Sequence, residues 1–264
     1  MDLQLSGRTA LVTGSTAGIG FAIARMLAGE GARVIVNGRT EARVEEAVGK
    51  IRQEHPGAQL QKFAGDLAQS RSTVSLIREF DHVDILVNNL GLYEPKAFEE
   101  ITDSDWSALI EANFLSGVRL SRHYLPRMKQ AGWGRILFIS SESAVNIPSE
   151  MIHYGVTKTM QVALARGLAE TTAGTGVTVN SLLAGPTRSE GVEGFLRDMA
   201  RTQGLSVEQV EAEFFQKLRP SSLLKRFETI DEVAAMATFL ASPLSSATNG
   251  AAVRVEGGLL RSIL

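Results

Sequence analysis

The chain has 264 residues, of which 44% are hydrophobic and 21% charged, and its formal net charge is -2. This composition is typical of a folded globular protein and excludes a disordered chain. The balance of acidic and basic residues lacks the surplus that binding to a phosphate backbone needs, so nucleic acid is not an expected partner. Because the chain has no cysteine, disulfide scaffolds, thiolate nucleophiles and cysteine-ligated metals are excluded.

The first seven residues carry neither the basic nor the apolar segment of a secretory signal. No apolar run reaches the length of about 18 residues that is typical of a membrane-spanning helix. We therefore expect a cytoplasmic protein with no membrane partner. No Pro-, Gly- or Ser-rich linker divides the sequence, so we expect one domain over residues 1–264.

Seven short apolar segments rich in β-branched residues are predicted as strands. They cover residues 9–13, 33–37, 60–64, 85–88, 136–140, 177–183 and 252–255. Stretches of helical periodicity follow at 18–29, 41–54, 70–80, 103–130, 154–173 and 230–241. Such alternation indicates βαβ units, and we expect an α/β fold of the Rossmann type with a doubly wound parallel sheet of about seven strands.

Residues 186–222 depart from this alternation, because two helical pieces at about 190–202 and 207–218 follow each other without a strand. Ser206 and Gln209 predict a capping box for the second piece. The apolar residues of the two pieces are Phe195, Leu196, Met199, Val210, Phe214, Phe215 and Leu218. We expect this insertion to cover a substrate, and the alternative is an amphipathic segment that only packs on the body.

A glycine-rich turn follows the first predicted strand, with the sequence Thr13-Gly14-Ser15-Thr16-Ala17-Gly18-Ile19-Gly20. Gly14 allows a tight turn, Gly18 lets the backbone approach a pyrophosphate, and Gly20 lets the helix pack close to the strand. The amino terminus of the helix offers N–H groups and the positive end of its dipole to a phosphate. The predicted dinucleotide-binding residues of this turn are Gly14, Ser15, Thr16, Gly18, Ile19 and Gly20.

The spacing of these glycines resembles the turn of the short-chain dehydrogenase/reductase family, and further motifs match that family in order. Asp66 and Leu67 follow the third strand, Asn88-Asn89-Leu90-Gly91 follows the fourth, and Val255-Glu256-Gly257-Gly258 lies at the last strand. In style the motifs are similar to the 3-oxoacyl-carrier-protein reductase branch. The resemblance implies that Asp66, Leu67, Asn88 and Gly91 lie at the cofactor, while Asn88 can equally support the sheet.

Cofactor preference is predicted from the end of the second strand, which reads Val36-Asn37-Gly38-Arg39. An NAD site would place an acidic residue about 20 residues beyond the turn, to bind the ribose hydroxyls. Gly38 stands there instead, and the guanidinium of Arg39 can bind a 2′-phosphate with charge-assisted hydrogen bonds. We therefore expect NADP(H) to be preferred over NAD(H), with a solvated surface Arg39 as the alternative.

The candidate catalytic residues are Asn113, Ser141, Tyr154 and Lys158. Tyr154 and Lys158 are four residues apart and share one face of a predicted helix. Ser141 ends an apolar strand 13 residues before Tyr154, and this spacing, together with Asn113 on an earlier helix, resembles the catalytic set of the family. Hydride delivery to a carbonyl builds negative charge on oxygen, so a phenol that donates a proton suits the reaction.

A free phenol has a pKa of about 10, and we expect the positive charges of Lys158 and of an oxidised nicotinamide to favour the phenolate of Tyr154. Ser141 would hold the substrate oxygen. The resemblance further implies that Lys158 binds the nicotinamide ribose and that Asn113 supports a water in a proton relay. It assigns the nicotinamide carboxamide to three residues after the sixth strand, Gly185, Thr187 and Ser189.

Residues between Ser141 and Tyr154 are expected to line the substrate pocket together with the insertion, namely Glu142, Ser143, Val145, Ile147 and Met151. The four histidines show no metal-ligand spacing, so no metal is expected. The resemblance also implies a homotetramer that pairs the helices at 103–130 and 154–173. Small residues there permit close packing between subunits, or only within one subunit: Ala163, Ala165, Gly167 and Ala169.

The expected function is hydride transfer between NADP(H) and a ketone or secondary alcohol, through Asn113, Ser141, Tyr154 and Lys158. The alternative is a catalytically idle NADP-binding sensor or scaffold that has kept the fold. The presence of all four chemical residues favours the enzyme.

Overall fold

A parallel sheet of seven strands forms the centre of the computed structural model, which describes residues 1–263 apart from the side chain of Phe195. The strand order is β3-β2-β1-β4-β5-β6-β9. The strands are β1 (Thr9–Val12), β2 (Arg33–Gly38), β3 (Leu60–Ala64), β4 (Ile85–Asn88), β5 (Gly134–Ser141), β6 (Val177–Ala184) and β9 (Ala252–Val255). This confirms the predicted Rossmann sheet. The order reverses between β1 and β4, and ligands of such sheets bind at that point, outside the carboxyl ends of the strands.

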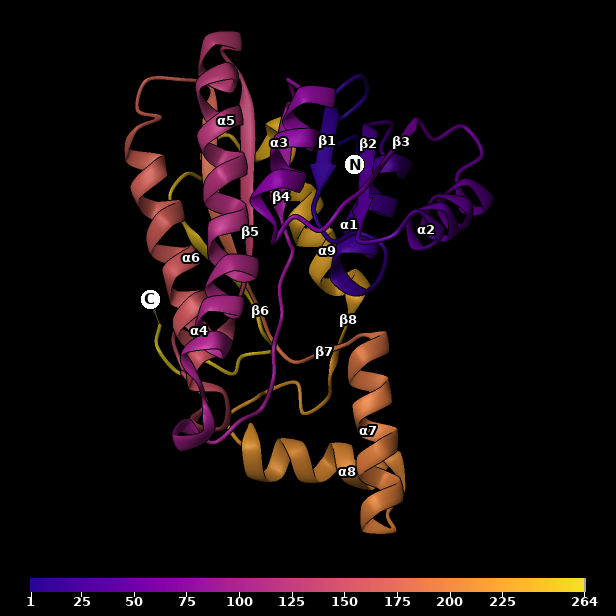
Figure 1. Ribbon diagram of the computed structural model, residues 1–264, viewed down its shortest axis with the longest axis vertical. Helices are drawn as coiled ribbons and strands as arrows, with labels where there is room; N and C mark the ends of the chain where they lie inside the picture. The colour runs from indigo at the N-terminus through magenta and orange to yellow at the C-terminus, as the bar shows by residue number, and fades with distance from the viewer. Residues whose placement is uncertain (264) are drawn as a thin grey trace.

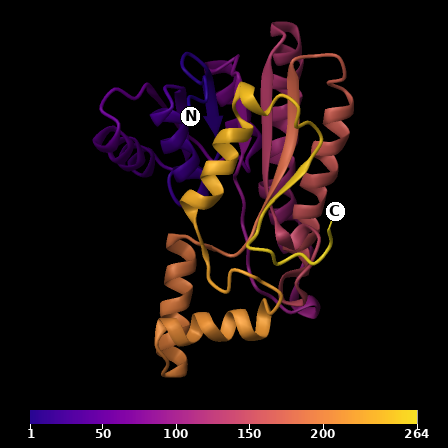
Figure 2. The same cartoon turned by 180° about the vertical axis from the view of Figure 1, so that it is seen from behind.

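Helices cover both faces of the sheet (Figures 1 and 2). One face carries α1 (Gly18–Gly29), α2 (Glu41–Glu54) and α9 (Ile230–Leu240), and the other carries α3 (Ser70–Glu79), α5 (Ser116–Ala131) and α6 (Ile152–Glu170). Ala10 and Val12 belong to the first of two apolar cores and Leu11 to the second, because successive strand residues point to opposite faces. None of the described helices is both long and apolar enough to cross a bilayer.

The segment predicted as one helix over 103–130 has three parts: α4 (Asp103–Leu109), a π-helical turn (Ile110–Leu115) and α5. A π-turn inserts one residue into a helix, and such turns frequently occur at functional sites. This one carries Asn113. The sequence did not reveal it, because one inserted residue barely disturbs an apolar period of 3.6.

The insertion forms a lobe, which we define as residues 190–218: α7 (Glu190–Gln203), α8 (Val207–Glu213) and a second π-helical turn (Phe214–Leu218). The lobe lies below the sheet in Figure 1. The capping box of Ser206 and Gln209 begins α8, as predicted. Its helices enclose a small apolar cluster, with Leu196, Ala200, Val210, Phe215 and Phe227 at its centre. The predicted contact of Phe195 lies outside the described residues.

Two strands of two residues each, β7 (Thr187–Arg188) and β8 (Glu228–Thr229), pair in parallel where the lobe joins the body. They were not predicted, because two residues carry no periodicity. Shorter 3-10 turns lie at Phe98–Glu100, Glu142–Ala144, Ser149–Met151 and Pro243–Ser245.

The junction of β1 and α1 depends on three glycines. Gly14 and Gly18 have φ of +62° and +57°, in the left-handed region that favours glycine. A β-carbon at Gly20 would lie 2.3 Å from Nδ2 of Asn89 and 2.5 Å from the carbonyl oxygen of Gly14. The helix can therefore approach the loop after β4 only because Gly20 has no side chain.

Gly20→Ala should lower stability, because the new methyl group must displace the Asn89 amide or the turn itself. Overpacking of this kind costs about 1–3 kcal/mol, which for a domain of this size lowers the melting temperature by roughly 2–10 °C in calorimetry. Gly49→Ala in α2 is the control, since nothing lies within 4 Å of a β-carbon there. If the Gly20 and Gly49 variants had the same melting temperature, this account of the junction would be wrong.

Candidate active site

The predicted site residues gather at the carboxyl ends of the strands, on both sides of the reversal between β1 and β4. The glycine turn follows β1, Asn88 ends β4, Ser141 ends β5, and Gly185 follows β6. The loops after the strands, together with α6 and the start of the lobe, surround this edge of the sheet. The position is the one at which a doubly wound sheet binds its ligand.

Two asparagines hold the glycine turn in place. Oδ1 of Asn37 accepts a hydrogen bond from the Gly14 N–H at 3.0 Å, and its carbonyl accepts one from the Ser15 N–H at 2.8 Å. Nδ2 of Asn89 donates to the carbonyl oxygens of Thr13 at 2.9 Å and Gly14 at 3.1 Å. The sequence analysis did not single out Asn37, although a polar residue at the end of the apolar run Val34-Ile35-Val36 was a usable signal.

Because of these hydrogen bonds, some residues of the turn support its shape, while the N–H groups of others stay available to a ligand. The Ser15 hydroxyl donates to the Val12 carbonyl at 2.7 Å and accepts from the Asn37 N–H at 2.9 Å. Ser15, predicted to bind the cofactor, thus has its N–H and its hydroxyl engaged within the protein. Ala17, the N-cap of α1, provides no side-chain acceptor. The first N–H groups of α1 therefore remain available to an anion.

A hollow of about 390 Å³ opens between the glycine turn and the start of the lobe. It is lined by Thr16, Ala17, Gly18, Phe21, Lys50, Arg188, Ser189, Glu190, Glu193 and Ile230. A β-carbon at Gly18 would lie 3.5 Å from Cβ of Ser189. The structure thus brings three predicted cofactor residues, Thr16, Gly18 and Ser189, around one space.

Arg39 is exposed at the open end of β2. A β-carbon at the preceding Gly38 would lie 2.3 Å from Cγ2 of Thr16, so an acidic side chain does not fit at that position unless Thr16 moves. The contact with Thr16 is therefore a second reason why glycine, and not an acidic residue, stands at position 38.

Asp66, Leu67 and Asn88 differ in what they can offer. Oδ1 of Asp66 accepts from the Ala68 N–H at 3.1 Å, at the half-buried end of β3. Leu67 is buried in the second core, so only its backbone could meet a ligand. Nδ2 of Asn88 donates to the Ser121 hydroxyl at 3.4 Å and its side chain is buried, which favours the sheet-supporting role.

The four predicted catalytic residues come together. Tyr154 lies in the first turn of α6 and Lys158 one turn later, with its Nζ 5.5 Å from the centre of the Tyr154 ring. Ser141, at the end of β5, lies close enough to the Tyr154 phenol to lower its pKa. Nζ of Lys158 donates to the Ile139 carbonyl at 2.9 Å. These groups form one polar cluster between β5 and α6, in which Ser141 and Lys158 are buried and Tyr154 is half-buried.

Burial controls the protonation of this cluster. Burial raises the pKa of Tyr154 to about 12, and the nearby Ser141 side chain acts in the opposite direction. Burial also lowers the pKa of Lys158 to about 8. The predicted stabilisation of the phenolate is therefore not a property of the side chains alone, because burial disfavours the charged form of Lys158, although a pKa of about 8 leaves most of it protonated at neutral pH.

Asn113 connects the catalytic helix to the loop after β4. Its Oδ1 accepts from the Leu92 N–H at 2.7 Å, and its Nδ2 donates to the Leu92 carbonyl and to the Thr157 hydroxyl, both at 2.9 Å. A β-carbon at Gly91 would lie 3.4 Å from Nζ of Lys158 and 3.5 Å from Oδ1 of Asn113. Both polar groups therefore border Gly91, and the relay assigned to Asn113 stays a prediction.

The residues assigned to the nicotinamide follow β6 as expected. A β-carbon at Gly185 would lie 2.8 Å from Cα of Glu256, so only glycine fits against the turn after β9. The Thr187 hydroxyl donates to the Gly185 carbonyl at 2.9 Å, and the Ser189 hydroxyl caps α7 by accepting from the Val192 N–H at 3.4 Å. Their roles toward a nicotinamide stay predictions.

The sequence analysis missed two neighbours of the site. The ring of Tyr93 lies edge-on to that of Tyr154, with 6.3 Å between centroids, and its hydroxyl oxygen would be 3.0 Å from a β-carbon at Gly191 in the lobe. Arg219 binds Glu142, the residue after Ser141. Both contacts join segments far apart in the chain, so no local pattern could reveal them.

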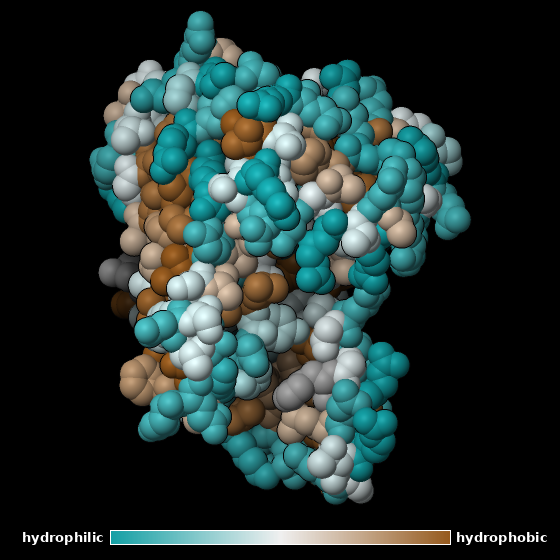
Figure 3. All heavy atoms as spheres, viewed as in Figure 1, coloured by the Kyte–Doolittle hydropathy of each residue, from teal (hydrophilic) through white to brown (hydrophobic). Residues whose placement is uncertain are grey.

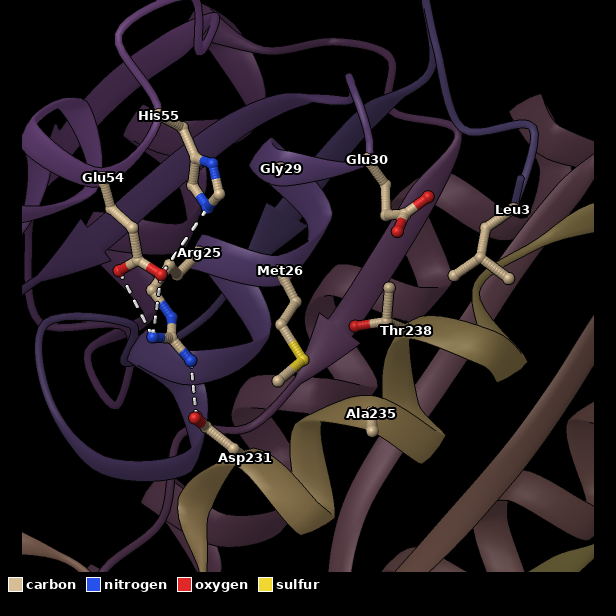
Figure 4. A pocket seen from close by; sticks show the side chains of 10 residues that line it. All are labelled: Leu3, Arg25, Met26, Gly29, Glu30, Glu54, His55, Asp231, Ala235 and Thr238. Atoms are coloured by element: carbon tan, nitrogen blue, oxygen red, sulfur yellow. Dashed lines mark hydrogen bonds and ion pairs between the residues drawn. The ribbon is translucent and has the colours of Figure 1, made fainter. Parts of the chain in front are cut away.

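A separate hollow of about 500 Å³ lies where α1, α2, α9 and the N-terminal segment meet (Figure 4). Arg25 crosses it and pairs with Glu54 at 3.2 Å and Asp231 at 2.5 Å. None of the predicted site residues lines it, so it is not the candidate site. Within residues 1–263, no three His, Cys, Asp or Glu side chains are grouped to hold a metal ion.

Comparison with known proteins agrees with this geometry. Residues 8–200 match the family described as short chain dehydrogenase. The oxidoreductase YvaG of Bacillus subtilis is 48% identical over 263 residues, covering all of both chains. D-beta-hydroxybutyrate dehydrogenase of Cupriavidus necator is 35% identical over 259 residues, which cover 97% of this chain and 98% of that protein.

Among solved structures, L-sorbose reductase of Gluconobacter frateurii, complexed with NADPH and L-sorbose, superposes with a TM-score of 0.93. It is 28% identical, and the match covers all of both chains. The family match, the relatives and the common fold together show that this chain belongs to the short chain dehydrogenase family of oxidoreductases.

Proposed function

We propose that the chain is an NADP(H)-dependent oxidoreductase that interconverts a ketone and a secondary alcohol. The observation that carries this proposal is the convergence of Asn113, Ser141, Tyr154 and Lys158 beside the glycine turn. Two similar solved structures support the choice of cofactor: L-sorbose reductase with NADPH, and a 3-oxoacyl (acyl-carrier-protein) reductase with NADP bound.

The residues present fit such a cofactor. The free N–H groups at the start of α1 suit a pyrophosphate, and the exposed guanidinium of Arg39 suits a 2′-phosphate. NADPH, when bound, supplies the hydride. The other residues that would hold it are Thr16, Gly18, Ile19, Gly20, Asp66, Gly91, Lys158, Gly185, Thr187 and Ser189, with Gly14, Ser15 and Asn88 as supports.

The chain's own chemistry is the handling of a proton. With a pKa raised to about 12, Tyr154 is protonated at neutral pH, which is the form that donates to a carbonyl oxygen during reduction. The Ser141 hydroxyl, which lies close to the phenol, would hold the same substrate oxygen. In the oxidative direction Tyr154 must first lose its proton, so positive charge beyond that of Lys158 is required.

Tyr154→Phe removes only the donor hydroxyl, so the fold and NADPH affinity should survive while turnover falls by about 100-fold or more, the scale of general acid catalysis. NADPH oxidation with a panel of ketones and fluorescence titration of NADPH measure the two quantities. Tyr124→Phe is the matched control, because it removes a phenol hydroxyl that donates to the Phe80 carbonyl at 2.7 Å, away from the site. Undiminished activity in Tyr154→Phe would refute the mechanism, and NADPH binding without any wild-type turnover would favour the idle sensor.

Arg39→Ala should weaken NADPH binding but leave NADH binding almost unchanged, because only NADPH carries the 2′-phosphate. A charged hydrogen bond is worth about 1.5–3 kcal/mol, so the dissociation constant should rise roughly 10- to 150-fold. Arg33→Ala is the control, since Arg33 is exposed at the opposite end of β2. Equal losses for both cofactors would mean that Arg39 has a structural role.

Ser141→Ala and Lys158→Met should separate substrate handling from cofactor binding. Ser141→Ala should lower turnover with little effect on NADPH affinity, because its hydroxyl is assigned to the substrate oxygen. Lys158→Met should weaken both, because the ammonium serves the phenol and the nicotinamide ribose. A Lys158 variant that keeps full NADPH affinity would remove the second of these roles.

We also propose assembly into a homotetramer through α5 and α6. Hydrophobic side chains gather in a column along these two helices (Figure 3). On α6, Ala163 and Gly167 are exposed and Met160 and Leu164 half-buried, and their spacing places them on one face. Ala165 and Ala169, named with them from the sequence, are buried in the second core instead.

Sedimentation of the protein at micromolar concentration should show a species of about four 28.4 kDa chains. Ala163→Glu should reduce the assembly, because a charge would have to be buried between subunits. A wild-type protein that sediments as a monomer at this concentration would count against the proposal.

A further inference from the structure

The lobe meets the body at its two ends. At its start, Arg188 of β7 binds Glu193 at 2.9 Å and also Glu211, so one residue just before the lobe contacts both α7 and α8. From there α8 runs back toward the lower end of α6, in both Figure 1 and Figure 2. Arg219 follows the last turn of the lobe and is the residue that reaches the catalytic side.

Arg219 is a buried guanidinium that binds two carboxylates. Its side chain is 6% exposed. Nε donates to Oε1 of Glu142 at 2.9 Å, and Nη1 donates to Oε1 of Glu150 at 3.0 Å. Nη1 also donates to the Leu218 carbonyl at 3.0 Å. The Glu142 side chain is only 3% exposed, so this pair is withdrawn from water.

The two carboxylates lie at the two ends of the segment between the catalytic hydroxyls. Glu142 directly follows Ser141 and begins the 3-10 turn Glu142–Ala144. Glu150 lies in the turn Ser149–Met151, which leads straight into α6 and Tyr154. A single side chain from outside the segment therefore fixes both of its ends.

A buried ion pair tolerates few intermediate arrangements. If the lobe moved and took Arg219 with it, Glu142 would be left as a charge out of water without a partner, which is strongly unfavourable. Movement of the lobe away from the segment 142–151 would therefore break the contacts of Arg219 with Glu142 and Glu150 together. An opening that admits a substrate would thus release both ends of this segment from Arg219, next to Ser141 and Tyr154.

We propose that Arg219 is a positioning residue that couples docking of the lobe to the alignment of Ser141 and Tyr154. The site is complete only when the lobe is docked, so closure over a substrate assembles the catalytic pair, as in induced fit. The effect on turnover rests on the proposed function, whereas the coupling between the two segments does not.

Hydrogen exchange measures the coupling without any substrate. Arg219→Met should raise exchange both in the lobe around 205–218 and in the segment 142–151. Lys217→Met is the matched control, since Lys217 lies two residues away and pairs only with the exposed Glu213 at 2.6 Å. It should leave both segments protected. Faster exchange in the lobe alone would overturn the proposal.

Turnover provides the second readout. Arg219→Met should lower kcat by about 10- to 100-fold, the scale of a small misplacement of catalytic groups, with NADPH affinity within about threefold of wild type. Arg219→Lys keeps the positive charge but loses the planar guanidinium that binds both carboxylates, so its kcat should lie between those of the Met variant and wild type. An unchanged kcat in Arg219→Met would overturn the role in alignment.

The double variant Glu142→Gln with Arg219→Met covers the case in which the single variant fails to fold. It removes both buried charges at once, and the Glu150 carboxylate that loses its partner is 36% exposed and can be hydrated, so thermal unfolding should return close to wild type. If Arg219 positions the segment, exchange there stays fast and kcat stays low in the folded double variant. Recovery of both would show that Arg219 only compensates the charge of Glu142. A wild-type protein without turnover would defeat the proposed function but leave the exchange result standing.

Discussion

The side-chain amide of Asn113 is the contact on which the arrangement of the site depends. It accepts a hydrogen bond from the Leu92 N–H and donates one to the Leu92 carbonyl. Its second N–H donates to the Thr157 hydroxyl. Gln161, one turn further along α6, donates to the backbone carbonyl of Asn113. The loop after β4 and the catalytic helix are thereby tied to one buried residue, and a buried amide without these partners would be costly. Asn113 lies in the π-turn, where the regular pattern of α-helical hydrogen bonds is interrupted, and its backbone carbonyl accepts a hydrogen bond from another helix.

Burial then determines which protonation states of Tyr154 and Lys158 are favoured. Withdrawing Tyr154 from water favours its neutral phenol, and withdrawing Lys158 favours its neutral amine, so burial disfavours the ion pair that would ease loss of the phenol proton. The side chains alone therefore favour a proton donor, which suits reduction. A phenol that is easily deprotonated requires charge from outside the chain, and this makes the direction of the reaction dependent on which form of the cofactor is bound.

Much of this site was predictable, because its cofactor half is local. Strands buried on both faces are continuous apolar runs, so the segment 85–88 was predicted with its observed ends, and glycines at a strand-to-helix junction have a direct backbone reason. The rest has no local pattern. The pairing of Arg219 with Glu142 spans 77 residues, and the meeting of Tyr93 with Gly191 joins a loop to the lobe. Ser15 is a further case, because no sequence pattern shows that its N–H donates to the Asn37 carbonyl and its hydroxyl to the Val12 carbonyl.

The glycine turn and the surroundings of Ser141 and Tyr154 also differ in the contacts that hold them in place. Asn37 and Asn89 fix the glycine turn through hydrogen bonds to the backbone of consecutive residues, and these bonds do not involve the lobe. On the side of Ser141 and Tyr154, Tyr93 faces Gly191 of the lobe, and Glu142 binds Arg219, the residue that follows the lobe. The contacts that hold the glycine turn are therefore intrinsic to the sheet, whereas those around Tyr93 and Glu142 cross to the lobe or to the residue that follows it. A movement of the lobe would disturb the second set of contacts and leave the first in place.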